Sequence, residues 1–190
     1  MFFDDAVTVS RELQLTLTGK DCGMEERAPM CGVPYHAYEV YMNKLIQKGY
    51  KVAIAEQMED PKLAKGLVKR EVIKVVTPGT ITSSQALEDG KNNYLMCIVY
   101  EEKGYGIATA DISTGDFYVT EVESLRILND EIFKFMPSEI VCNESLRMSG
   151  LDFNDLKSRL NISISTLDNT SFAEDKVHSL LRHHFHVDRM

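Results

Sequence analysis

The chain of 190 residues contains no tryptophan, only four cysteines and no apolar stretch long enough to cross a membrane. A membrane helix needs about 20 consecutive apolar residues, and the N-terminus has neither the basic start nor the apolar segment of a secretory signal. The cysteines form no C-x-x-C pair, which argues against a zinc ribbon or a redox motif. We therefore expect a cytoplasmic protein with reduced thiols, no bound metal and no membrane partner.

Acidic residues exceed basic ones by eight, and the whole excess lies in the second part of the chain. Residues 1–77 carry 11 lysines and arginines against 11 aspartates and glutamates, whereas residues 78–190 carry 10 against 18. Within the neutral part, residues 62–74 hold several basic side chains and only Glu71 as an acid. The basic residues are Lys62, Lys65, Lys69, Arg70 and Lys74. Such a cluster can bind phosphates, although a solvated strand edge has the same composition.

Two units are expected to meet where the sequence pattern changes. Pro78-Gly79 is a turn signal, because proline presets φ at one position and glycine accepts a positive φ at the next. The stretch that follows is polar and has no regular apolar face. We therefore interpret residues 78–91 as a linker between domains at 1–77 and 92–190.

The first domain is expected to be α+β with a mixed sheet. Apolar residues at helical spacing predict two helices, and Gly49 is expected to end the second one. Leu13, Leu15 and Leu17 alternate with polar residues, which predicts a half-buried strand before a loop rich in glycine and proline. In chain order we expect a helix at 4–13, a strand at 13–17, a loop at 19–34, a helix from His36, a buried strand at 51–56, a helical turn at 61–65 and a strand at 68–77.

The second domain is expected to have the element order of the ribonuclease H-like fold, which makes the chain α/β. Turns of a few residues between the first three strands permit only antiparallel hairpins, and a strand that follows a helix is expected to be parallel to a neighbour. We expect strands at 94–100, 105–112 and 117–122, a helix at 125–136, a strand at 139–142, a helix at 153–160, a strand at 162–165 and a helix at 171–185. No strand follows the last helix, so we expect this domain to be incomplete.

Carboxylates on neighbouring strands suggest a catalytic alternative. Asp111, Asp116 and Glu121 could hold Mg²⁺ as two-metal nucleases do, but Asp116 follows Ser-Thr-Gly and fits a turn. Four histidines at 178–186 include no i, i+4 pair, and a helix end explains them better than a metal site. Neither a Gly-x-Ser-x-Gly nor a Walker A motif is present. We expect no catalytic residue and keep a ribonuclease H-like nuclease as the least favoured hypothesis.

Two stretches carry a resemblance to a known family: PMCGVPYHA at 29–37, and the run at 56–80 that ends in Val-Thr-Pro-Gly-Thr. They resemble the N-terminal mismatch-binding domain of the bacterial DNA mismatch repair proteins of the MutS family. FFDDA at 2–6 is similar to the opening helix of that domain, and residues 104–121 are similar to the start of the family's connector domain. The resemblance covers essentially the whole chain.

The resemblance implies a DNA mismatch repair protein that bends DNA at a mispair. In the family a Phe-x-Glu pair enters the minor groove, and a mispair has less stacking to lose when it is opened. Here the match begins just after that pair, and neither Phe2 nor Phe3 is followed two residues later by glutamate. The lever, clamp and ATPase regions have no counterpart either. We therefore expect a fragment that is not an enzyme and lacks the family's ATP and Mg²⁺ cofactors.

The resemblance also implies which residues lie near DNA and which partners act. The expected DNA-binding residues are Lys20, Met30, Tyr35, His36, Lys65, Lys69 and Arg70. Phosphate contacts by such residues position a protein without reading sequence, although packing of the loop explains Met30 and Tyr35 equally well. The implied partners are double-stranded DNA with mismatches, a MutL-type protein at the acidic second domain, and a second copy in a dimer.

Two non-catalytic hypotheses remain open. The chain is a DNA-binding module of the MutS type, whose own binding is weak, salt-sensitive and without mismatch preference, or a stand-alone interaction module built on the connector. Reversing the charges of Lys69 and Arg70 distinguishes them, because DNA binding is lost only in the first case.

Overall fold

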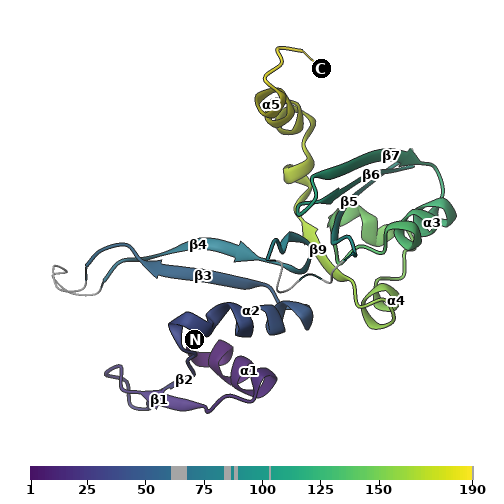
Figure 1. The fold of residues 1–190 in the computed structure, drawn as a ribbon. Coiled ribbons are helices and arrows are strands. Elements are labelled where there is room, and N and C mark those ends of the chain that lie inside the picture. The colour runs from purple at the N-terminus through teal and green to yellow at the C-terminus, as the bar shows by residue number, and fades with distance from the viewer. Residues whose placement is uncertain (61–67, 84–86, 88–89, 103, 190) are drawn as a thin grey trace. The chain divides into compact units, whose positions relative to one another are not determined.

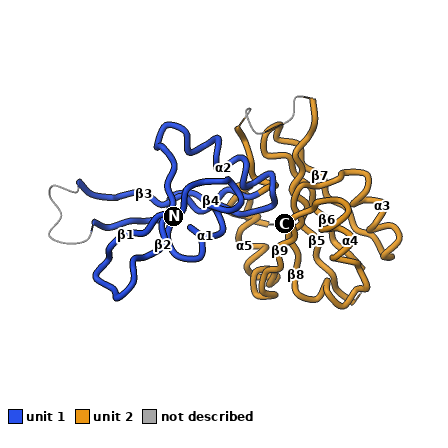
Figure 2. The backbone as a smooth tube through the Cα atoms, turned by 90° about the horizontal axis from the view of Figure 1, so that it is seen from below, with its two compact units in different colours: residues 1–77 blue, residues 78–190 orange. Residues whose placement is uncertain are grey.

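The computed structural model describes residues 1–60, 68–83, 87, 90–102 and 104–189. The chain divides into two compact units, residues 1–77 and residues 78–190 (Figures 1 and 2). The helical turn expected at 61–65 lies outside the described residues. Among the helices that the structure describes, none has the length and apolar character needed to cross a membrane.

Unit 1 contains two helices and two antiparallel hairpins. Its elements are α1 (Phe3–Leu13), β1 (Thr18–Lys20), β2 (Ala28–Met30), the 3-10 helix η1 (Tyr35–Ala37), α2 (Tyr38–Gln47), β3 (Val52–Gln57) and β4 (Arg70–Val76). Strand β1 pairs with β2, and β3 pairs with β4. Within the described residues of this unit the strands thus form two separate pairs, and the mixed sheet of the chain lies in unit 2.

The expected strand at 13–17 and part of the expected loop at 19–34 are wrong. Leu13 is the last residue of α1, and Gln14 takes a left-handed conformation that ends the helix. Leu13 and Leu15 both pack against the small core of this unit, so their spacing reflects a helix end and the turn after it. Within the predicted loop, residues at both ends pair as β1 and β2.

The second helix ends where the sequence predicts. Gly49 has a φ of 85°, and its N–H donates to the carbonyl of Ile46 over 2.8 Å. The N–H of Tyr50 donates to the carbonyl of Leu45 over 3.1 Å, and both side chains belong to the same apolar cluster. This pair of bonds is a Schellman motif, which needs a residue that tolerates positive φ at the position of Gly49.

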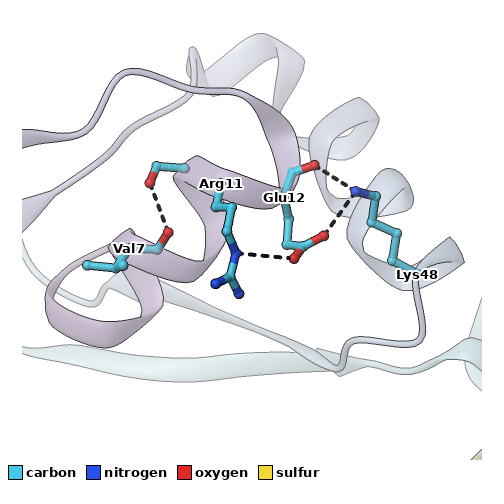
Figure 3. Close-up of polar contacts among 5 residues, drawn as sticks. Val7, Arg11, Glu12 and Lys48 are labelled. Carbon is cyan, nitrogen blue, oxygen red and sulfur yellow. Dashed lines mark hydrogen bonds and ion pairs between the residues drawn. The ribbon is translucent and has the colours of Figure 1, made fainter.

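Polar contacts join α1 to the end of α2 (Figure 3). The ammonium of Lys48 donates to the backbone carbonyl of Glu12 at 2.8 Å and to its carboxylate at 3.0 Å. Arg11 lies 3.6 Å from the same carboxylate. The hydrogen bond from Lys48 is the main reason why the pKa of Glu12 lies below its usual value. The contact therefore stabilises the fold at neutral pH and is lost as the pH falls and Glu12 becomes protonated.

Unit 2 is a five-stranded mixed sheet in the order β7-β6-β5-β8-β9. Its elements are η2 (Pro78–Thr80), β5 (Tyr94–Glu101), β6 (Gly104–Asp111), β7 (Asp116–Val122), α3 (Leu125–Phe135), β8 (Glu139–Asn143), η3 (Glu144–Met148), α4 (Phe153–Ser158), β9 (Ser163–Leu167), η4 (Asn169–Phe172) and α5 (Glu174–Phe185). The first three strands are antiparallel, and β8 and β9 are parallel to their neighbours. The predicted element order and the α/β class are confirmed.

The core of unit 2 lies between one face of this sheet and the segments that connect its later strands, which include α3, η3 and α4. Strands β5, β6 and β8 contribute alternate residues, and α3 contributes Leu128 and Ile132, both fully buried. Ser124 caps α3 by accepting a hydrogen bond from the N–H of Ile127, and Pro137 follows its end. In contrast, α5 has no buried residue, and its Leu180 and Phe185 are exposed.

The start of the expected linker is packed. Pro78, Gly79 and Ile81 are buried, and the N–H of Gly79 donates to the carboxylate of Glu139 on β8 over 3.2 Å. Gly79 has no positive φ, so its role differs from the one that the turn signal predicts. Residues 78–81 are therefore part of unit 2 and not a loose connection.

Candidate nucleic-acid interface

The β1–β2 hairpin places Lys20 beside the N-terminal residues. Phe2 forms an isolated β-bridge with Met30, and the terminal amine of Met1 donates to the carbonyl of Cys31 over 3.0 Å. The Lys20 ammonium lies 5.9 Å from the centroid of the Phe2 ring, within the range of a cation–π contact. Lys20 is exposed and Met30 is half-buried. The hairpin thus presents a cation supported by an aromatic ring.

The 3-10 helix η1 presents Tyr35 and His36 to solvent. The Tyr35 side chain is 82% exposed, and its ring centroid lies 6.1 Å from that of Tyr38. His36 is also exposed. Packing of the loop therefore does not explain why a tyrosine stands at position 35. Met30, in contrast, is half-buried and forms a β-bridge with Phe2, so packing explains this residue.

The β3–β4 ribbon is mostly exposed, so the expectation of a buried strand at 51–56 is wrong. A shift in pairing leaves Ile73 as an extra residue, because Ile54 faces Lys74 whereas Ala55 faces Val72. This bulge changes the alternation of side chains along β4. Arg70 and Lys74, which are four residues apart and would share one face of a regular strand, instead lie on opposite faces of the ribbon.

Acidic neighbours reduce the charge around Lys69. Its ammonium pairs with the carboxylate of Glu71, and its backbone N–H donates to the carboxylate of Glu59 over 2.8 Å. Arg70 is exposed at the start of β4, opposite Gln57. The local positive charge is therefore smaller than the count along the sequence predicts.

The structure distributes the described members of the expected DNA-binding set over three elements of unit 1. Lys20 and Met30 share the β1–β2 hairpin, Tyr35 and His36 lie on η1, and Arg70 begins β4 directly after Lys69. Lys65 lies outside the described residues.

Arg27 is a further cation of the β1–β2 hairpin, and the sequence pattern does not single it out. This exposed residue flanks β2, and a Cβ added at Gly19 on β1 would lie 3.0 Å from its Cβ. Arg27 therefore stands across the hairpin from the segment that carries Lys20. The glycines and prolines of residues 19–34 predict a loop without pairing, and a loop gives no signal that Arg27 lies across from Lys20.

The carboxylates of the nuclease hypothesis do not form a cluster. Asp111 and Asp116 are partners at one end of the β6–β7 pair, whereas Glu121 faces Gly106 toward the other end. Among the residues that the structure describes, no group of three or more potential ligands could hold a metal ion. The four histidines on α5 and at its C-terminal end are exposed. The rings of two of them, His183 and His186, have centroids 6.4 Å apart.

The carboxylate of Asp111 is held in a network of hydrogen bonds within unit 2. This buried group accepts hydrogen bonds from the N–H and hydroxyl of Ser113, the N–H of Asn93 and the amide of Asn92. Burial by itself raises the pKa of Asp111, but these hydrogen bonds together lower it below the usual value. The carboxylate is therefore ionised and saturated by donors of its own chain.

Comparison with known proteins identifies the family. The family model described as MutS domain I matches residues 1–85, and that described as MutS domain II matches residues 93–189. The chain is 58% identical over 187 residues to the DNA mismatch repair protein MutS of Lachnoclostridium phytofermentans, covering 98% of this chain and 20% of that protein. It is 52% identical over 188 residues to the protein of the same name from Ruminiclostridium cellulolyticum, covering 97% and 22%.

A third such protein, from Acetivibrio thermocellus, is 53% identical over 188 residues, covering 97% of this chain and 22% of its own length. The chain therefore spans about a fifth of the length of the curated relatives it matches. The two family models and the three relatives all match this chain over both of its units. The chain belongs to the MutS family and carries its domains I and II.

Proposed function

We propose that unit 1 binds the phosphate backbone of double-stranded DNA, as part of a cytoplasmic mismatch repair protein. The observation that carries this proposal is the exposure of Lys20, Arg27, Tyr35 and Arg70 at two hairpins and η1 in a chain of the MutS family. Lysine and arginine side chains release counterions when they meet phosphates, which supplies affinity without sequence preference.

Binding by this chain is expected to be weak, sensitive to salt and indifferent to mismatches. Unit 1 contains no Phe-x-Glu pair, so the wedge that the family resemblance implies has no counterpart among its residues. Without a wedge, the lower stacking energy of a mispair gives no advantage. Binding is also expected to need neither ATP nor Mg²⁺.

Reversing the charge at the start of β4 tests the proposed DNA contact. The double variant Lys69→Glu, Arg70→Glu is expected to weaken binding to a fluorescent 30-base-pair duplex by at least about tenfold and to flatten the dependence of log K on log salt by about two. The matched control is Arg126→Glu, Lys157→Glu, which makes the same change in net charge on exposed positions of α3 and α4. Equal losses in both variants would show a general charge effect and contradict a contact at β4.

The absence of mismatch preference has a separate test. A titration of the 190-residue chain with a G·T heteroduplex and with the matched homoduplex is expected to give the same affinity within about twofold, because phosphate contacts carry no base information. Tighter binding to the heteroduplex by several fold would overturn this part of the proposal while leaving the backbone contact intact.

We also propose that unit 2 binds a protein partner, of the MutL type that the family resemblance implies. The specific observation is α5, an amphipathic helix without a buried residue on which Leu180 and Phe185 are 68% and 57% exposed. The acidic balance of residues 78–190 favours a protein over DNA for this surface.

A further inference from the structure

A cavity of about 590 Å³ lies within unit 2, at the carboxyl ends of the parallel strands β5 and β8. The described residues that line it belong to the end of β5 and the turn after it, to the end of β8 and the start of η3, and to η4. Its volume lies within the range that proteins use to bind small ligands. The cavity thus stands apart from the DNA-binding residues proposed on unit 1 and from the exposed face of α5.

The side chain of Asn143 opens this cavity by replacing backbone pairing between β5 and β8. The register of the two strands ends at Ile98 and Cys142. Beyond that point the N–H of Tyr100 donates to the Oδ1 of Asn143 over 3.1 Å, and the Nδ2 of Asn143 donates to the carbonyl of Tyr100 over 3.0 Å. The two strands are therefore held apart by a buried side chain, and the cavity lies where they separate.

The order of the strands gives this position a second meaning. Strand β5 lies between the antiparallel β6 and the parallel β8. The chain leaves β5 toward β6 on one side and leaves β8 toward β9 on the other side. In open sheets, ligands bind outside the carboxyl ends of neighbouring strands whose connections leave in opposite directions. The topology therefore marks this cavity as a binding site before its side chains are considered.

Glu101 and Glu102 make the cavity negative. Both are exposed, and neither side chain has a hydrogen bond or an ion pair with any residue in the described part of the chain. The described lining contains no lysine or arginine that would neutralise them. An anionic ligand is therefore disfavoured at this place and a cation is favoured.

Aromatic rings form another part of the wall. Tyr100 and Phe172 both line the cavity and are half-buried. The ring of Tyr100 packs against that of Tyr105, with centroids 4.9 Å apart. The start of η4, which carries Phe172, is held by Asp168, whose carboxylate accepts the N–H of Thr170 over 2.7 Å. Two supported rings beside two unpaired carboxylates suit a planar cation, because a guanidinium group can stack on aromatic faces and pair with carboxylates at once.

We propose that this cavity binds the guanidinium group of an arginine side chain that a protein partner inserts between the end of β5 and η4. The carboxylates of Glu101 and Glu102 pair with the cation, and the rings of Tyr100 and Phe172 contact its plane. The excess of acidic residues in unit 2 attracts a partner whose surface is basic. This inference rests on the proposal that unit 2 binds a protein partner, and it adds a site distinct from α5.

Titration with a small arginine derivative tests the cavity without the partner. N-acetyl-arginine N-methylamide is added to the ¹⁵N-labelled chain and followed by NMR. We expect saturable shifts at the amides of residues 100–102, 143–145 and 169–172, with a Kd on the order of 1 mM. The citrulline derivative, which has nearly the same shape and no charge, is expected to bind at least about tenfold more weakly, and the lysine derivative about threefold more weakly.

Single-charge variants locate the contact. Glu101→Gln and Glu102→Gln are each expected to weaken arginine binding by about threefold, and the double variant by about tenfold. The matched control is Asp130→Asn, which removes one negative charge from an exposed position of α3 outside the cavity and should leave the affinity unchanged.

Three results would overturn the inference: no saturable shifts at these amides, equal binding of the citrulline or lysine derivative, or an equal loss in Asp130→Asn. The small probe requires neither α5 nor DNA. A negative titration therefore removes the arginine site alone and leaves the proposed functions of both units to their own tests.

Discussion

Replacing Asp111 by asparagine is expected to destabilise unit 2 by about 2–3 kcal/mol at neutral pH. The carboxylate is 1% exposed and accepts hydrogen bonds from the backbone of Asn93 and from both the backbone and the side chain of Ser113. An asparagine keeps one acceptor oxygen and turns an NH₂ group toward donors. At least one buried N–H is then left without a partner, which costs more than an ordinary hydrogen bond contributes.

The pH dependence of this loss follows from the low pKa of Asp111. A group whose pKa is lowered in the folded state stabilises it above the unfolded pKa, and this stabilisation disappears as the pH falls through the folded pKa. The difference between the parent chain and Asp111→Asn is therefore expected to be full at pH 7 and to shrink below the usual aspartate pKa of about 3.9. Urea denaturation at several pH values measures it.

The matched control for this experiment is Asp130→Asn. Asp130 is exposed on α3, and its replacement changes the net charge by the same amount without entering a buried network. It is expected to change stability by less than about 0.5 kcal/mol. If both variants lost the same stability, charge alone would explain the effect and the hydrogen-bond network would not.

The elements of unit 2 could be predicted from the sequence because their boundaries depend on local chemistry. Short turns separate its first strands, Ser124 caps α3, and Pro137 follows its end. Each of these signals acts within a few residues. The pairing order then follows from hairpins and helical crossovers, which leave few alternatives.

Errors arose where distant residues decide the outcome. Leu15 resembles a strand residue, but its packing against the core of unit 1 is compatible with an irregular segment. Pro78-Gly79 resembles a turn, but Gly79 is needed for its approach to Leu95 and Glu139, which lie 16 and 60 residues farther along the chain. Local patterns do not contain this information.

The candidate interface was predictable in residue type and not in geometry. A count of charges along the sequence identifies Lys69 and Arg70 as basic residues. The ion pair of Lys69 with Glu71 and the bulge at Ile73 change which positive charges each face of the ribbon exposes. A bulge depends on the partner strand, and β-strand register is set by pairing and packing more than by the strand's own composition.

Replacing Gly104 by alanine is expected to destabilise unit 2 by about 3 kcal/mol or more. Gly104 begins β6 with a φ of 143°, which side chains rarely adopt, and an added Cβ would lie 2.6 Å from the backbone carbonyl oxygen of Val122 on β7. That oxygen belongs to a neighbouring strand and cannot move away as a flexible side chain could. Strain and steric clash therefore act together.

Gly106→Ala, two residues farther along the same strand, is the internal control. Its Cβ would meet no atom within 4 Å, and its φ is ordinary for a strand. Alanine also restricts the unfolded chain more than glycine does, so this variant is expected to lie within about 1 kcal/mol of the parent chain, on the stabilising side. Urea midpoints of the two variants measure the contrast. Equal midpoints would show that the β6–β7 pair yields at its end, and that the position of Gly104 is not held by the carbonyl of Val122.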